Sequence, residues 1–289
     1  MADGVGAWSP APAWTPARAL PGLLPEGPPL PLDDQDPYRV AHAAPRHPGL
    51  SGPAVLDGAA HEQWSRTWSK TADALRLGGE QRVAEAVALL RCLVPLAQPP
   101  GPGPDDARET GSCSGTRREA FGALLSSRPP TPVTFAATLV HELQHTKLSA
   151  LGDMLVLHRA GPRKRYFAPW RPDPRPYDGL VQGVYSHLAL ADFFQRCALR
   201  AERPAHRAAA WARHARYRAQ VAAALPALVG SPDLTERGRR FVDHLVATHE
   251  RMAEHPAPRE HVVRAEAQVT AVRDLWTRRH GAALGRPHH

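Results

Sequence analysis

The chain has 289 residues, 43% hydrophobic and 22% charged, and this ordinary globular composition excludes a wholly disordered protein. Its 36 basic and 28 acidic residues give a formal net charge of +8. The arginines are dispersed and no nucleic-acid-binding motif accompanies them, so we expect no nucleic-acid partner. Cys92, Cys113 and Cys197 lack paired spacing, which argues against a disulfide framework or a cysteine-rich metal site. We find neither a secretory signal nor a membrane span in the sequence, and we expect a soluble, cytoplasmic protein.

The first part of the chain predicts coil followed by helices. Residues 1–60 are rich in proline, glycine and alanine and show no sustained helical period, which predicts a long extended N-terminal coil. The apolar spacing then changes, and residues 61–96 predict two amphipathic helices. The break between these helices falls at Gly78-Gly79, and the second one ends before Pro95.

A short strand and a long helix are predicted in the middle of the chain. Residues 118–126 are the best strand candidate, although a short helix also fits them. Thr131 followed by Pro132 is typical of a helix start, with the threonine as N-cap and the proline in the first turn. The helix should continue to about Leu157, and its nearly all-round apolar surface predicts that it is buried.

The remaining sequence predicts a proline-rich loop and further helices. Residues 161–179 contain five prolines and cannot form a helix, and their aromatic residues favour an ordered loop. Residues 180–199 return to helical spacing, and three more helices follow from Ala205 onward. We therefore predict a mainly α fold with a small strand element, in which residues 61–289 form one mostly helical domain.

The most informative motif is HELQH at residues 141–145, inside the predicted long helix. His141 and His145 are four residues apart, so both imidazoles lie on one helix face and can reach one metal ion. Glu142 lies beside them, where it can contact a metal-bound water or orient a ligand. The motif alone also fits two surface histidines, but a buried helix favours partners for these polar groups.

Two common zinc-peptidase patterns for the third ligand do not fit. The metzincin extension requires glycine and histidine at positions that are occupied by Leu148 and Leu151. A glutamate on a following helix is excluded as well, because the sequence has no glutamate between Glu142 and Glu202. Spacing alone nevertheless does not separate a zinc-bound water from the open coordination positions of a non-haem iron site.

The third ligand must therefore be another histidine or an aspartate. The possible ligands downstream of the motif are Asp153, His158, Asp173, Asp178, His187 and Asp192. We favour His187, because it lies on the helix after the proline-rich loop, where the small residues Gly183 and Ser186 permit close approach of another helix.

Residues 117–194 resemble a known family. The resemblance rests on REAFGALLSS, FAATLVHELQHTKLSALGD and YFAPWRPDPRPYDGLVQGVYSHLALADFF, and weaker similarity extends toward the N-terminus. These segments are similar to the HExxH domain found in peptide-maturation clusters of actinobacteria, a family of 2-oxoglutarate-dependent peptide β-hydroxylases. The combined motifs are far more selective than HExxH alone.

The resemblance implies a non-haem iron centre. Fe(II) would be bound by His141, His145 and His187, and 2-oxoglutarate and O₂ would occupy the open coordination positions. Glu142 would then act by holding a ligating water or orienting a histidine, and not as a peptidase base. The implied reaction is hydroxylation of the β-carbon of a residue in a ribosomally made precursor peptide, with a radical-SAM maturation enzyme as a further partner.

The resemblance also assigns roles within the proline-rich loop. The far carboxylate of 2-oxoglutarate needs a cation, for which Arg171 is the first candidate and Arg175 the second, because an arginine fork binds a carboxylate with two hydrogen bonds. Trp170 would line the pocket and Tyr166 would contact the substrate. Two alternatives stay open, a zinc-dependent peptidase that trims a peptide and a non-catalytic module that binds one.

Overall fold

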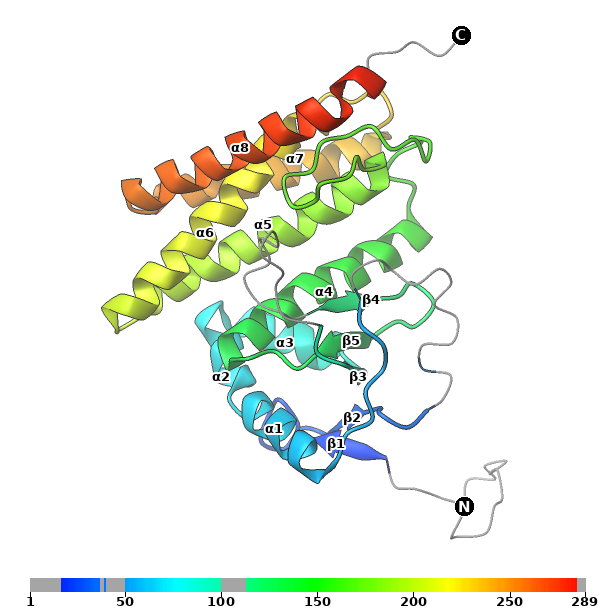
Figure 1. The fold of residues 1–289 in the computed structure, drawn as a ribbon, viewed down its shortest axis with the longest axis vertical. Helices are drawn as coiled ribbons and strands as arrows, with labels where there is room; N and C mark the ends of the chain where they lie inside the picture. The colour runs from blue at the N-terminus through cyan, green and yellow to red at the C-terminus, as the bar shows by residue number, and fades with distance from the viewer. Residues whose placement is uncertain (1–16, 37–38, 40–49, 100–112, 285–289) are drawn as a thin grey trace.

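The structure, a computed structural model, describes residues 17–36, 39, 50–99 and 113–284. It is mainly helical with one small sheet, as the sequence predicts (Figure 1). The helices are α1 (Gly58–Trp68), α2 (Thr71–Leu77), α3 (Glu80–Leu89), α4 (Pro132–Met154), α5 (Tyr177–Arg200), α6 (Pro204–Ala224), α7 (Glu236–Arg251) and α8 (Arg259–Leu284). The strands are β1 (Arg18–Leu20), β2 (Leu30–Leu32), β3 (Cys92–Leu96), β4 (Ser114–Thr116) and β5 (Ala123–Ser127).

The sheet has the strand order β1-β2-β3-β5-β4, and its two central pairings, β2–β3 and β3–β5, are parallel. Part of the predicted N-terminal coil therefore forms strands, since β1 and β2 lie within residues 1–60. Leu30 and Leu32 point into the core while Pro31 between them is exposed, a period-two pattern that is too short to stand out in the sequence. Most of the remaining predicted coil lies outside the described residues.

The segment between residues 58 and 96 is divided more finely than its spacing predicts. The predicted break at Gly78-Gly79 is confirmed, and Gly79 adopts a φ of 114°, which side-chain-bearing residues rarely tolerate. A further break separates α1 from α2, and the chain forms strand β3 after Leu90. The predicted strand at 118–126 is found in its second half, as β5.

Helix α4 begins where the sequence predicts. The Thr131 side chain accepts a hydrogen bond from the backbone N–H of Thr134, and Pro132 is the first helical residue. The helix packs against α5, against α1–α3 and against β4, which places it at the centre of the molecule (Figure 1).

Two hydrophobic cores meet along α4 and α5. The first core contains Trp68, Phe135 and Phe193 and joins α1–α3 and the sheet to the first half of α4 and the end of α5. The second core contains Leu148 and Tyr177 and joins the end of α4 and the first half of α5 to α6 and α7. Both helices therefore contribute side chains to both cores.

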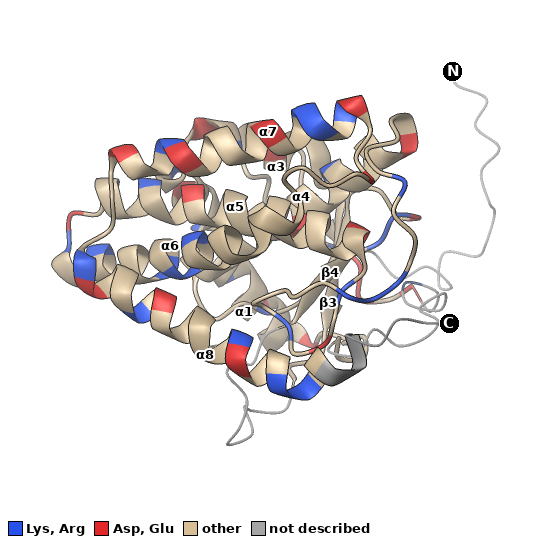
Figure 2. Cartoon of the chain, turned by 90° about the horizontal axis from the view of Figure 1, so that it is seen from above, with Lys and Arg blue, Asp and Glu red and all other residues tan. Residues whose placement is uncertain are grey.

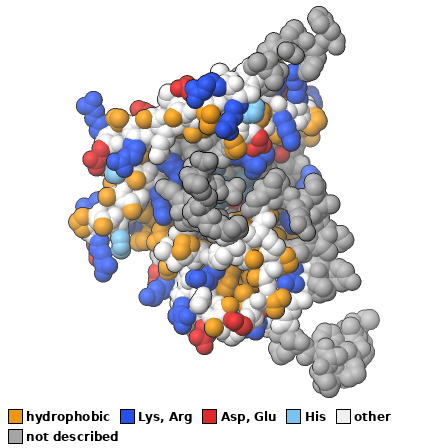
Figure 3. Space-filling view, in the orientation of Figure 1, with side chains coloured by type: hydrophobic (Ala, Val, Ile, Leu, Met, Phe, Trp, Pro, Cys, Tyr) orange, Lys and Arg blue, Asp and Glu red, His pale blue; other side chains and the backbone are white. Residues whose placement is uncertain are grey.

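Charged side chains are spread over the C-terminal helices. Helices α7 and α8 carry basic and acidic side chains in close succession (Figure 2). On the face shown in Figure 3, basic groups are likewise scattered and acidic groups lie among them. None of the helices in the described part of the chain is long and apolar enough to cross a bilayer.

Two glycines give opposite predictions for stability. A Cβ at Gly238 would lie 1.8 Å from the backbone oxygen of Leu157, whereas a Cβ at Gly152, within α4, would contact nothing within 4 Å. We expect Gly238→Ala to lower the free energy of unfolding by about 1–3 kcal/mol or more, because a backbone clash cannot be relieved by a rotamer change. Gly152→Ala should raise it by about 0.5–1 kcal/mol through helix propensity. Urea unfolding measures both, and equal effects of the two substitutions would contradict this packing.

Candidate metal centre

The three histidines of the predicted site come together between α4 and α5. The ring centroids of His141 and His145 are 4.7 Å apart, and those of His141 and His187 are 5.4 Å apart. The Nε2 atoms of His141 and His145 are separated by 3.1 Å. Because metal–nitrogen bonds are about 2.0–2.1 Å long, two ligands of one ion can also have this separation.

Hydrogen bonds fix the orientation of two of the imidazoles. His187 Nδ1 lies 2.8 Å from the carbonyl oxygen of Gly183, and since a carbonyl only accepts, Nδ1 carries the proton. His145 Nδ1 donates in the same way to Gln182 Oε1 over 3.0 Å. A ring with its proton on Nδ1 keeps its Nε2 lone pair available, which is the arrangement found in histidines that bind metals.

Burial favours the neutral form of His141 and His187. It lowers the pKa of His187 to about 3, against the hydrogen bond to the Gly183 carbonyl, which raises it, and the charges of His145 and Arg216 lower it further. Part of the His141 residue stays accessible, but desolvation of its ring, together with His145 and His187, lowers its pKa well below the ordinary value. Neutral imidazole is the form that binds a metal, so His141 and His187 can bind one at pH 7 without first losing a proton.

The low pKa of His187 predicts an acid-sensitive metal-free protein. The unfolded chain binds a proton near pH 6.5, whereas the folded His187 binds it only near pH 3. The stability that this ring contributes is thus complete above 6.5 and is lost as the pH falls toward 3, by up to about 1.4 kcal/mol per pH unit. We expect urea unfolding of a His187→Gln variant to show a shallower loss over this range. Equal slopes for the two proteins would contradict the assignment.

Glu142 is directed toward the sheet. Its side chain is buried, and Ser114 on β4 donates a hydrogen bond to Glu142 Oε1 over 2.7 Å. Burial raises the pKa of the Glu142 carboxyl, while His145, the Ser114 hydroxyl and the Thr116 hydroxyl lower it in part. Strand β4 therefore holds Glu142 beside His145.

Trp170 is the loop residue that reaches the imidazole cluster. Its indole stacks on His187 with ring centroids 4.4 Å apart and an interplanar angle of 21°. A Cβ at Gly183 would lie 2.2 Å from the indole, so the small residue expected to admit another helix admits this tryptophan instead. Trp170 thus covers one side of His187.

The two predicted arginines gather around Asp173. Arg171 Nε lies 3.0 Å from Asp173 Oδ1, and Arg175 Nη1 lies 3.7 Å from Asp173 Oδ2. Arg175 packs over Gly179, which lies two helical turns before His187 on α5. Trp170 packs over Gly183, one turn before His187, and so lies nearer to the imidazoles.

Tyr166 is placed farther from the cluster. Its backbone pairs with that of Arg175, and its hydroxyl accepts a hydrogen bond from Arg165 over 2.8 Å. Its ring packs against Tyr177 in the first turn of α5, ten residues before His187. The structure therefore does not bring Tyr166 to the imidazoles.

The other possible third ligands interact elsewhere. Asp153 pairs with Arg118, His158 lies beside Asp178, and Asp192 binds Arg82 and Arg196. Together with Asp173, these side chains account for every alternative to His187 that the sequence offers. His187 is the one whose ring meets His141.

Some residues near the cluster are not identifiable from the sequence. The Tyr217 ring on α6 lies 5.4 Å from the His187 ring, and the charge of its neighbour Arg216 acts on His187. Gln182 and Ser114 hold the histidine and the glutamate of the motif. No spacing rule connects these positions to HELQH, because the contacts depend on how α6 and β4 pack on α4 and α5.

Among the described residues, no group of three or more His, Cys, Asp or Glu side chains is placed so that it could hold a metal ion as it stands. Imidazole nitrogens are suitable metal ligands, so His141, His145 and His187 could bind one ion if their rings turned toward it.

Comparison of the chain with protein-family models and with curated proteins finds no match.

Proposed function

We propose that the protein is an Fe(II)- and 2-oxoglutarate-dependent oxygenase that hydroxylates the β-carbon of a residue in a ribosomally made peptide. The observation that supports this most is the meeting of three imidazoles, two of which have their Nδ1 protons held by acceptors. His141, His145 and His187 would bind the iron, leaving neighbouring positions open. With 2-oxoglutarate and O₂, bound iron supplies the oxidising power that replaces a C–H hydrogen with hydroxyl.

The residues around the imidazoles would prepare the site for this chemistry. Trp170 shields His187 from water on one side and keeps its ring in place. Glu142, held by Ser114, would hold a ligating water or help to orient His145. This role differs from that of a peptidase base, which would have to accept a proton from a metal-bound water.

Arg171 is the stronger candidate for the far carboxylate of 2-oxoglutarate. It directly follows Trp170, which covers His187, whereas Arg175 lies over Gly179, two turns away. Asp173 holds both guanidinium groups, so an incoming carboxylate would replace an existing acceptor rather than meet an unpaired charge. Under this proposal the protein acts in the cytoplasm, on a precursor peptide and alongside a radical-SAM maturation enzyme.

A mass measurement tests the proposal. The protein is purified without oxygen and loaded with Fe(II), then given 2-oxoglutarate, O₂ and candidate precursor peptides. Addition of one oxygen atom to a peptide, with formation of succinate, is the expected result. Cleavage of the peptide by the zinc-loaded protein would instead favour the peptidase, and binding of the peptide without turnover with either metal would favour a non-catalytic module. Both outcomes contradict the oxygenase.

A further inference from the structure

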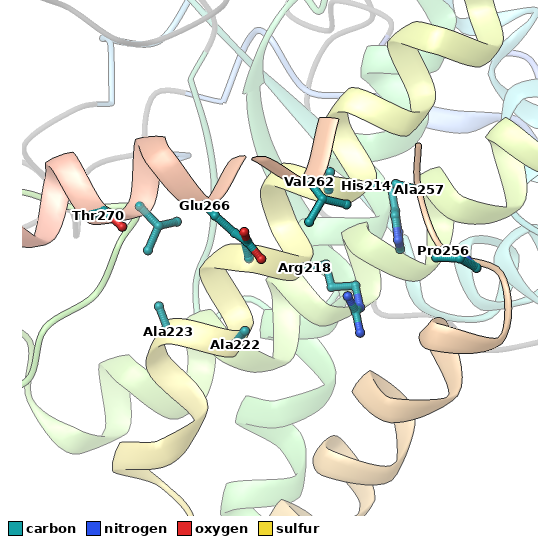
Figure 4. Close-up of a pocket in the computed structure, with 12 residues that line it drawn as sticks. His214, Arg218, Ala222, Ala223, Pro256, Ala257, Val262, Glu266 and Thr270 are labelled. Atoms are coloured by element: carbon teal, nitrogen blue, oxygen red, sulfur yellow. The ribbon is translucent and has the colours of Figure 1, made fainter. Parts of the chain in front are cut away.

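A cavity lies between α6 and α8, and none of the three cluster histidines lines it. Its volume is about 320 Å³, at the lower end of the range for small-molecule sites. Alanine and valine side chains form most of its wall, and its polar lining residues are His214 and Arg218 from α6 and Glu266 and Thr270 from α8 (Figure 4). The cavity therefore combines a narrow apolar space with a few polar groups.

His214 provides a hydrogen-bond acceptor without a partner. The residue is 1% exposed, and its Nδ1 donates to the carbonyl oxygen of Ala191 over 2.9 Å. The neutral ring therefore has a lone pair on Nε2, and this buried atom has no hydrogen-bond partner. An unpaired buried acceptor is costly, so a donor that reaches this atom when the cavity wall moves would be bound favourably.

Opposite charges lie on the two walls. Arg218 follows His214 by one helical turn, so both side chains lie on the same face of α6, and the buried Nε of Arg218 has no hydrogen-bond partner. Glu266 extends from α8. Within the described part of the chain, neither Arg218 nor Glu266 takes part in an ion pair. The cavity thus presents a cation and an anion that do not neutralise each other.

We propose that this cavity binds a free amino acid with an aliphatic side chain such as that of leucine. The ammonium group would donate to Glu266 and to Nε2 of His214, and the carboxylate would accept hydrogen bonds from Arg218. The ammonium and carboxylate of an amino acid are attached to the same carbon atom. They can therefore reach His214 and Arg218, which are one helical turn apart on α6. Ala222 and Val262 would enclose the side chain. This site is independent of the proposed oxygenase activity.

Calorimetric titration with L-leucine tests this site in the full-length protein. We expect leucine to bind with a Kd below about 1 mM, and both N-acetyl-leucine and leucinamide to bind at least about ten-fold more weakly, because each lacks one of the two charges. Arg218→Gln and Glu266→Gln should each weaken leucine binding by about ten-fold or more. Arg278→Gln and Asp274→Asn, which change exposed α8 residues outside the cavity, should bind like the unmodified protein.

Three outcomes would overturn the proposal. They are no heat of binding with leucine at about 10 mM, equal affinity for leucine and its two derivatives, and unchanged affinity in both Arg218→Gln and Glu266→Gln. Thermal unfolding of each variant establishes that it is folded before its affinity is compared. Because Fe(II) and peptide are absent from this titration, its result does not depend on the metal centre.

Discussion

A His187→Ala variant is expected to bind Fe(II) more than about 100-fold more weakly than the unmodified protein and to lose peptide hydroxylation. The substitution removes the one proposed ligand from α5 and leaves only the His141–His145 pair of α4. Even partners that only orient a metal ligand are worth about 10–100-fold in affinity, so loss of a ligand should cost more. Metal content after anaerobic dialysis and a competition titration with a chelator measure the effect.

His244→Ala is the matched control for this experiment. His244 is an exposed histidine on α7, and its removal should leave metal content unchanged. Unfolding of both variants by urea shows whether any loss of metal follows from loss of structure. Full metal retention by a folded His187→Ala protein would exclude His187 as a ligand.

Gly183→Ala is expected to destabilise the protein by about 1–3 kcal/mol and to weaken metal binding. The added Cβ would lie 2.2 Å from the Trp170 indole, which is held between Gly183 and the His187 ring. The indole must therefore move, and the stacking on His187 must change with it. Helix propensity acts in the opposite direction by about 1 kcal/mol, so a net loss would be due to the clash. Thermal unfolding and the chelator titration measure the two effects.

Gly179→Ala separates this clash from a general effect of alanine in α5. Its Cβ would meet the end of the Arg175 side chain at 2.9 Å, and a flexible guanidinium can move away at little cost. We expect this variant to be as stable as the unmodified protein or slightly more stable, with unchanged metal affinity. Identical behaviour of the two alanine variants would show that Trp170 does not depend on Gly183.

The sequence predicts α4 well because the signals for this helix are local. Thr131 and Pro132 act within one turn, and the four-residue spacing of His141 and His145 places both rings on one face in any α-helix. The sequence left six possible third ligands, and it favoured His187 because of the helical spacing and the small residues around it. The signals for α4 needed no knowledge of how the helices pack, whereas the choice of His187 already assumed that α5 approaches another helix.

The strands and the loop were harder to predict, since their structure depends on distant partners. Strand β2 has only three residues and is defined by its neighbours β1 and β3. The sequence suggests that Gly183 admits a helix, but nothing in it indicates that Trp170 fills this space. Asp173 binds both candidate arginines, which becomes visible only when the loop is folded.

The position of the three imidazoles has a consequence for how the protein melts. His141 and His145 lie where α4 passes from the first core to the second, and Leu188 and Ala189, which follow His187 on α5, belong to different cores. An ion bound there would stabilise the packing on both sides together, because it binds only the folded protein. Scanning calorimetry should accordingly record one heat-absorption peak, and iron should move the whole peak to higher temperature without splitting it.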